Sequence, residues 1–196
     1  MIESAPPHPF IVVHDGDSGL ERLPRPVVAI GNFDGVHLGH RAVIARALER
    51  AQAAHRPAAV LTFEPHPRSV LQPDLHSFRL TSEAAKMRLL AATGLDGAIV
   101  LTFDAALAGL TAEEFVARIL VERLDITGAV IGFNFHFGRE RRGSPDFLIA
   151  QGAQHGFTVD VVPPVHRHGK RVSSGAVREA LAAGHVTEAA DLLGYP

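Results

Sequence analysis

Cysteine and tryptophan are absent from this chain of 196 residues, which also has only one tyrosine and two methionines. Without cysteine the protein can form no disulfide, and no thiolate is available as a nucleophile or a metal ligand. Long hydrophobic runs are missing too, since no apolar stretch approaches the length of a membrane-spanning helix. Residues 1–25 carry several prolines and charges and lack the basic-then-apolar pattern of a secretory signal. We therefore expect a cytoplasmic protein with no membrane partner.

An excess of charge of one sign is also lacking. The chain has 19 lysines and arginines against 21 aspartates and glutamates, for a formal net charge of −2. No basic run exceeds two consecutive residues, and the densest basic cluster is Arg139, Arg141 and Arg142. Nucleic-acid-binding domains usually carry a basic face, so we expect no nucleic-acid partner.

Apolar runs of strand length alternate along the chain with amphipathic helical patterns. Such alternation predicts an α/β fold with a mostly parallel sheet of five to six strands and helices on both faces. With 46% hydrophobic residues, the chain is long enough for one well-buried core. The patterns predict strands at 27–30, 58–63, 97–101, 128–132 and 158–162, and helices at 41–54, 82–93, 111–124, 144–156, 174–183 and 187–193.

The segment from Gly31 to His40 lies between a buried strand and an amphipathic helix, and it carries the clearest functional signal. Open α/β sheets bind anions at such junctions, because the first amides of a helix have no partner within the helix. Gly35 and Gly39 permit unusual dihedrals and close approach of the backbone to a ligand. His37 and His40 are three residues apart, so both imidazoles can face the same anion. The segment predicts a phosphate site.

Two other interpretations of His37 and His40 are open from the residues alone. Both side chains could be ordinary surface residues at a helix start. They could instead be zinc ligands, although the chain has no cysteine and no third ligand stands nearby at a typical metal spacing.

A second candidate phosphate contact is the pair Ser174 and Arg178, four residues apart at the start of a predicted helix. This spacing puts the hydroxyl and the guanidinium on one face, where they can bind the same oxygens. The alternative is that Ser174 only caps the helix and Arg178 is a solvated charge.

Two further segments offer aromatic side chains at strand ends. The segment from Phe63 to Pro67 is held extended by two prolines and could form one wall of a site for a flat ring, or it could be a stiff loop with Phe63 in the core. Asn134 and Phe137 follow the fourth predicted strand, at the edge where open sheets bind ligands.

Four segments together resemble one known family. Residues 31–40 resemble the ATP-binding signature of the nucleotidylyltransferase superfamily, and in detail that of the FMN adenylyltransferase module of bacterial bifunctional riboflavin kinase/FMN adenylyltransferases, the FAD synthetases. Residues 62–67 resemble the segment beside the flavin in that family, 132–138 its third motif, and 173–178 its Ser-Ser-x-x-x-Arg phosphate motif. The resemblance covers about residues 10–196, in the order of the family.

The resemblance implies a Rossmann-like nucleotidylyltransferase fold and the roles of individual residues. Catalysis would involve His37, His40, Asn134, Ser174 and Arg178. The ATP site would comprise Gly31, Asn32, Phe33, Asp34, Gly35, His37, Gly39, His40, Ser173, Ser174 and Arg178. The FMN site would comprise Phe63, Pro65, His66, Pro67, Asn134 and Phe137.

Three positions depart from the pattern of this family. Asn134 and His136 stand where the family frequently shows Asp and Arg, and Gly175 where it often shows Ser or Thr. The role of His136 is therefore open. The arginines at 139, 141 and 142 form either a loop that contacts phosphates or a solvated one.

The activity implied is FMN adenylyltransferase, which transfers AMP from MgATP to FMN and yields FAD and pyrophosphate. FMN and FAD would be substrate and product, and Mg²⁺ would come with ATP, held by phosphate oxygens and water rather than by protein ligands. Two alternatives are an adenylyltransferase for another phosphorylated small molecule, and a non-catalytic flavin- or nucleotide-sensing module.

For domain organisation we expect a single FMN adenylyltransferase domain spanning residues 1–196. The riboflavin kinase of the bifunctional family is a separate β-barrel with a Pro-Thr-Ala-Asn motif, which this sequence does not contain. We expect that domain to be absent from this chain, so that the chain cannot phosphorylate riboflavin. A riboflavin kinase module, fused or separate, is the expected partner in the cell.

Overall fold

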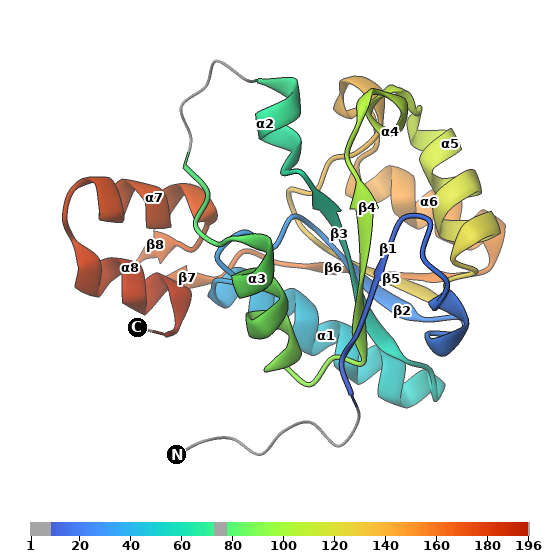
Figure 1. Cartoon of the computed structure of the whole chain (residues 1–196), viewed down its shortest axis with the longest axis horizontal. Coiled ribbons are helices and arrows are strands. Elements are labelled where there is room, and N and C mark those ends of the chain that lie inside the picture. Colours follow the sequence, from blue (N-terminus) through green and yellow to red (C-terminus); the bar gives the residue numbers. More distant parts are fainter. Residues whose placement is uncertain (1–8, 73–77, 196) are drawn as a thin grey trace.

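The computed structural model describes residues 9–72 and 78–195, and its centre is a six-stranded sheet with strand order β1-β4-β3-β2-β5-β6, parallel throughout (Figure 1). All five predicted strands are present with bounds within one residue, and the predicted fold class is confirmed. The strands are β1 (Ile11–His14), β2 (Val27–Ile30), β3 (Ala58–Glu64), β4 (Gly97–Thr102), β5 (Gly128–Gly132) and β6 (Thr158–Val162).

The edge strand β1 was not predicted. It has only four residues, of which one is buried, and it pairs with β4 alone. So short a strand gains its stability from the sheet that it joins, which is a contact that local sequence does not reveal.

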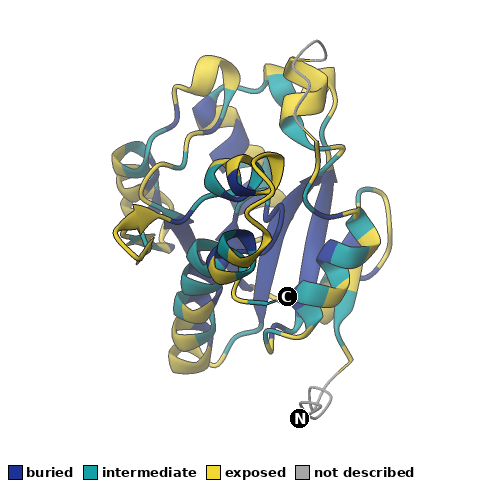
Figure 2. Ribbon diagram, turned by 90° about the vertical axis from the view of Figure 1, so that its left-hand side faces the viewer, coloured by how far each residue is buried: buried dark blue, intermediate teal, exposed yellow. Residues whose placement is uncertain are grey.

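Helices cover both faces of the sheet, as the alternation predicted (Figures 1 and 2). Successive residues of a strand point to opposite faces, so β2 contributes Val27 and Ala29 to one core cluster and Val28 and Ile30 to another. The first cluster packs against α1 (Leu38–Ala54) and α3 (Glu83–Ala91). The second packs against α5 (Ala112–Glu114), the π-helical segment η2 (Phe115–Arg123) and α6 (Pro145–His155).

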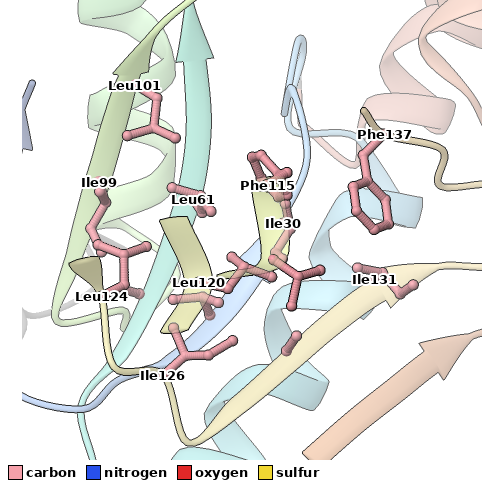
Figure 3. Close-up of a cluster of buried hydrophobic side chains, with 14 of the residues drawn as sticks. Ile30, Leu61, Ile99, Leu101, Phe115, Leu120, Leu124, Ile126, Ile131 and Phe137 are labelled. Carbon is pink, nitrogen blue, oxygen red and sulfur yellow. The ribbon is translucent and has the colours of Figure 1, made fainter. Parts of the chain in front are cut away.

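The second cluster is the larger, and Figure 3 shows how it is filled. Ile30, Leu61 and Ile99 project from three neighbouring strands towards Leu120 and Phe115 on the covering helix. All five side chains are buried, so this layer holds the strands in the register on which the site at the sheet edge depends.

The helix predicted at 111–124 has the predicted extent but a different winding. Thr111 and Glu114 form the expected capping box, and residues 115–123 continue as a π-helix. Its wider turn places residues five apart, such as Phe115 and Leu120, on nearly the same side, and both are buried.

A third cluster lies beside the sheet and is built by the end of the chain (Figure 1). Here α7 (Ser174–Ala182) packs against α8 (Val186–Leu193), next to a short hairpin of β7 (His166–Arg167) and β8 (Lys170–Arg171). Other short elements absent from the prediction are α2 (Pro67–Leu71), α4 (Ala105–Gly109), and the 3₁₀ turns Leu20–Arg22 and Arg139–Arg141. In the part of the chain that the structure describes, no helix is long and apolar enough to cross a membrane.

Candidate active site

The site begins at the end of β2, where the chain enters residues 31–37, which we call the glycine turn. After β2 the chain forms β3, which lies on one side of β2 in the sheet. On the other side of β2 lies β5, and the chain continues from β5 outward to β6. The order of strands therefore reverses between β2 and β5, and the carboxyl ends of strands at such a point are where open sheets bind ligands. The glycine turn leads directly into the N-terminus of α1.

Helix α1 begins at Leu38, three residues earlier than predicted, because the side chain of His37 caps it. The Nδ1 atom of His37 accepts a hydrogen bond from the amide of His40 at 3.2 Å. A ring nitrogen that accepts a bond carries no proton, so the neutral ring of His37 bears its proton on Nε2 and can donate there to a ligand. A Cβ at Gly39 would lie 3.1 Å from this ring, so a larger residue there would crowd the histidine that caps the helix.

His40 stacks directly on His37, with the ring centroids 3.6 Å apart and the planes inclined by 14°. Among the described residues, the buried Nδ1 of His40 has no hydrogen-bond partner. Burial lowers the pKa of His37 to about 4, and burial together with the charge of Lys86 and the neighbouring His37 lowers the pKa of His40 well below its usual value. The two imidazoles are therefore neutral at pH 7 and act as hydrogen-bond donors rather than as cations.

The neutral state of His37 predicts a loss of stability in mild acid. Its folded-state pKa of about 4 lies below the 6.5 of an exposed histidine, so the unfolded chain takes up the proton first as the pH falls. The stabilisation is complete above about pH 6.5 and is lost between there and about pH 4. Between pH 7 and pH 5 we expect the free energy of unfolding in urea to fall by about 2 kcal/mol through His37 alone.

The variant His37→Asn provides the control, because asparagine also caps helices but does not titrate. Its free energy of unfolding should depend on pH less steeply over the same interval. An identical pH dependence in the variant and the parent protein would contradict the assignment.

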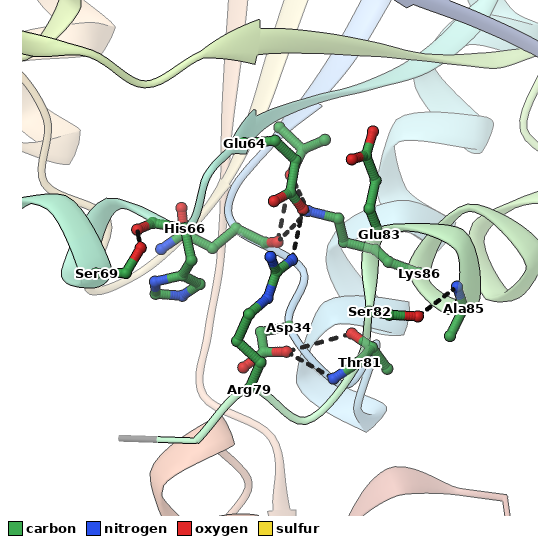
Figure 4. Close-up of polar contacts among 12 residues, drawn as sticks. Asp34, Glu64, His66, Ser69, Arg79, Thr81, Ser82, Glu83, Ala85 and Lys86 are labelled. Carbon is green, nitrogen blue, oxygen red and sulfur yellow. Dashed lines mark hydrogen bonds and ion pairs between the residues drawn. The ribbon is translucent and has the colours of Figure 1, made fainter. Parts of the chain in front are cut away.

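Asp34, within the glycine turn, is buried and its carboxylate is fully engaged by the protein. It accepts a hydrogen bond from the amide of Leu80 at 3.0 Å. It also accepts from the amide of Thr81 at 3.0 Å and from the Thr81 hydroxyl at 3.2 Å (Figure 4). It also forms an ion pair with the guanidinium of Arg178. The predicted ATP-site residue Asp34 thus ties the turn to two other parts of the chain.

Helix α7 brings Ser174 and Arg178 to the glycine turn, and the prediction that both lie on one face of a helix is confirmed. The Ser174 hydroxyl donates to the carbonyl of Asp34 at 3.0 Å, while Ser173 rather than Ser174 caps the helix by accepting the amide of Ala176. Arg178 also donates from Nε to the carbonyl of Phe78 at 2.7 Å. A guanidinium has five N–H donors, so others are left for an anion.

The other predicted ATP-site residues are spread along the turn itself. Gly31 follows β2, and the carbonyl of Asn32 accepts hydrogen bonds from the Thr62 hydroxyl and the Lys86 ammonium. Phe33 has a φ of 52°, and its side chain is buried in the first core cluster, the one that packs against α1 and α3. Gly35 has a φ of 80°, and a Cβ there would lie 2.8 Å from the Leu80 side chain, so any other residue at this position would be strained.

A second polar cluster, which the sequence analysis missed, lies next to this turn (Figure 4). The carboxylate of Glu64 pairs with Lys86 at 2.6 Å and with Arg79 at 2.7 Å, and Lys86 is buried. Burial raises the pKa of Glu64, but the bonds and charges of Arg79 and Lys86 outweigh it, and the net shift is downward. The sequence did contain a signal for this cluster, because Lys86 falls on the buried face of the predicted helix 82–93.

The segment from Phe63 to Pro67 differs in part from its prediction as an extended turn. Pro67 is the first residue of α2, and His66 caps this helix by accepting the amide of Arg68 at 3.1 Å. Pro65 is exposed, which leaves it at the rim of the site. Burial is the main cause that lowers the pKa of His66, whose ring also lies within the fields of Asp34 and Arg178.

The two predicted flavin aromatics lie inside the core rather than on an open surface. Phe63 and Phe137 flank Phe115, with ring centroids 6.5 Å and 5.4 Å from it, and each is 8% exposed. The alternative interpretation of Phe63 as a core residue is therefore confirmed. Contact of Phe137 with a flavin stays a prediction.

Asn134 is exposed beyond β5, as is His136, at the carboxyl edge of the sheet. Nearby, the guanidinium of Arg171 lies 5.8 Å from the ring centre of Phe133, a cation–π contact that the sequence analysis did not anticipate. Arg139, Arg141 and Arg142 are exposed, and Arg142 pairs with Glu140. The structure does not bring this arginine loop into contact with the glycine turn through any hydrogen bond between described residues.

Comparison with known proteins adds to this geometry. Residues 20–176 match the FAD synthetase family. A bifunctional riboflavin kinase/FMN adenylyltransferase of Pseudomonas fluorescens is 44% identical over 87% of this chain and 54% of its own length, and that of Escherichia coli K12 is 40% identical over 92% and 58%. This chain thus spans little more than half the length of these curated relatives.

A third relative is of similar size to this chain. It is a putative bifunctional riboflavin kinase/FMN adenylyltransferase of Geobacillus thermodenitrificans, 35% identical over 94% of this chain and 97% of its own length. Among solved structures, one titled a macrolide-efflux protein from Streptococcus pneumoniae has a TM-score of 0.81 at 29% identity, covering 95% of this chain and 62% of its own. A pantoate-beta-alanine ligase from Francisella tularensis, at 12% identity, 88% and 80% coverage and a TM-score of 0.52, shares the fold alone.

Proposed function

Because this chain belongs to the FAD synthetase family, we propose that it transfers the adenylyl group of ATP to the phosphate of FMN and releases FAD and pyrophosphate. One observation carries the proposal. The N-terminus of α1, with its two stacked neutral imidazoles, and the face of α7 that bears Ser174 and Arg178 meet at Asp34. Helix-terminal amides, imidazole N–H groups and a guanidinium are the donors that a triphosphate requires.

The reaction needs no covalent enzyme intermediate. A phosphate oxygen of FMN attacks the α-phosphorus of ATP in line, a new P–O bond forms, and pyrophosphate leaves with the electron pair of the bond that breaks. Catalysis then consists of positioning the two substrates and stabilising charge on the transferring and leaving oxygens. We assign this stabilisation to His37, His40 and Arg178, since all three carry N–H donors beside the N-terminus of α1.

Magnesium enters this proposal with ATP and neutralises charge on its phosphates when bound. The carboxylate nearest to the α1 N-terminus, Asp34, is committed to Arg178 and to two backbone amides, so it is not free to hold the ion. Among the described residues, no group of three or more metal-ligating side chains is gathered in one place. Phosphate oxygens and water would therefore provide most of the coordination.

We assign the flavin to the rim formed by Pro65, His66 and Pro67, together with Asn134 across the sheet edge. His66 supports this assignment, because its ring is only half-buried and lies close enough to Asp34 and Arg178 to feel their charges. The FMN consumed would come from a riboflavin kinase, fused or separate, in the cytoplasm.

The proposal predicts FAD and pyrophosphate when the purified chain is incubated with FMN and MgATP, followed by chromatography. Riboflavin in place of FMN should yield no FAD, because it lacks the phosphate that acts as the nucleophile. Nicotinamide mononucleotide and phosphopantetheine should not be adenylylated. If either of them reacts while FMN does not, the flavin assignment is wrong. Calorimetric binding of FMN and MgATP, measured in parallel, distinguishes slow turnover from a missing site.

A further inference from the structure

The glycine turn adopts a conformation that it cannot hold on its own. Phe33, Gly35 and Val36 have φ values of 52°, 80° and 36°, in the left-handed region. This region is costly for residues other than glycine, and a β-branched residue such as Val36 is found there only when its surroundings impose it. Because His37 and the first amides of α1 follow immediately, whatever imposes this conformation also positions the ligand donors.

Three side chains hold three consecutive carbonyl groups of the turn. The Ser174 hydroxyl donates to the Asp34 carbonyl at 3.0 Å, and the Arg41 Nε donates to the Val36 carbonyl at 3.4 Å. The carbonyl between them, that of Gly35, accepts a hydrogen bond from the hydroxyl of Tyr195 at 2.8 Å. This bond to Tyr195 is the shortest of the three and fixes the Gly35–Val36 peptide, which lies between the two left-handed residues.

Tyr195 reaches the turn from the far end of the chain. Gly194, with a φ of 79°, ends α8 in a left-handed conformation and turns the backbone towards the N-terminus of α1. The guanidinium of Arg41 then lies 5.5 Å from the centre of the Tyr195 ring, so the same arginine contacts the tyrosine and the turn. Burial raises the pKa of the phenol although Arg41 opposes it, and the hydroxyl therefore remains a donor at physiological pH.

We propose that Tyr195 is a positioning residue for the nucleotide: its hydroxyl keeps the Gly35–Val36 peptide in the orientation that presents His37 and the first amides of α1 to the phosphates of ATP. The inference rests on the proposed function only in taking ATP as the ligand. Tyr195 acts through the backbone and need not touch ATP. Loss of its hydroxyl therefore weakens the ATP site specifically and leaves the flavin site unchanged.

The test is the variant Tyr195→Phe, which removes the hydroxyl and keeps the ring beside Arg41. We expect the Kd of MgATP, measured by calorimetry without FMN, to rise about 3- to 10-fold, as for one lost hydrogen bond. The Kd of FMN should not change. In the FAD assay the KM for ATP should rise by about the same factor, and kcat should fall as well, because Tyr195 positions His37, a donor to charge that develops in the transition state.

Thr127→Val is the matched control. The Thr127 hydroxyl donates at 3.0 Å to the carbonyl of Arg25, which also has a left-handed φ of 50°, but this bond lies just before β2 and β5, at the end of these strands opposite to the site. The variant should lower the melting temperature about as much as Tyr195→Phe and leave the Kd of MgATP unchanged.

An unchanged Kd of MgATP in Tyr195→Phe would overturn the proposal, as would equal weakening of ATP and FMN binding. A parent protein that binds MgATP but forms no FAD would refute the FMN adenylyltransferase assignment instead. In that case the comparison of MgATP Kd values still decides the role of Tyr195.

Discussion

Replacement of His40 by alanine is expected to lower kcat for FAD formation by about 10²- to 10³-fold, the usual cost of removing one preorganised donor to a developing charge. His40 is stacked on His37, and its pKa is held well below its usual value, so the ring is a neutral donor at assay pH. Its contact with the transferring phosphate should strengthen as charge develops on the oxygens. The Kd of FMN should therefore change little.

Two further variants make the result specific. His40→Gln places an amide N–H near the position of Nε2 and should recover part of the activity that His40→Ala loses. His155→Ala removes an exposed histidine at the end of α6 and should have no effect on kcat. A kcat within about threefold of the parent in His40→Ala would mean that His40 is not the donor assigned to it.

Replacement of Asp34 by alanine is expected to lower the free energy of unfolding by about 3–5 kcal/mol, the usual cost of removing one partner of a buried ion pair. The substitution leaves the guanidinium of Arg178 without its carboxylate and removes the acceptor of the Leu80 and Thr81 amides. Urea unfolding at pH 7 measures the change. Binding of MgATP should be lost as well, because the turn loses its attachment to α7.

The double variant Asp34→Ala/Arg178→Met separates the charge from the backbone contacts. Removal of the unpaired guanidinium should restore part of the stability, and adding the single variant Arg178→Met completes the double-mutant cycle that gives the coupling energy of the pair. Glu188→Ala, which breaks the exposed pair with Lys170, should change stability far less, because water screens an exposed ion pair. A loss in Asp34→Ala as small as that in Glu188→Ala would show that the buried pair is not stabilising.

Much of the fold could be predicted because most of its strands and helices are marked by residues that are close together in the sequence. Strands β2 to β6 were predicted from short apolar runs, and the caps at Thr111 and Ser144 from residue types at fixed offsets. The short strand β1 and the hairpin β7–β8 escaped prediction because their stability comes from the elements that they contact.

The candidate site, too, was predicted only where residues close together in the sequence determine its geometry. The sequence predicted the junction at Gly31–His40 and the shared helical face of Ser174 and Arg178, because three- and four-residue spacings on a helix determine which side chains are neighbours. It did not predict that Ser173 is the cap, that Pro67 starts a helix, or that Phe137 is buried.

The sequence by itself thus determined which residues enter the site, since residue type and spacing specify a strand, a glycine turn and a capped helix. Only the tertiary structure decided the protonation, the hydrogen bonding and the backbone conformation of those residues. His37 and His40 are neutral because the fold buries them, Asp34 is committed because Arg178 reaches it from 144 positions away, and Gly35 is held because Tyr195 returns to it across the fold. Burial and contacts between distant segments set electrostatic energies and backbone strain, and neither quantity is encoded in the neighbouring sequence.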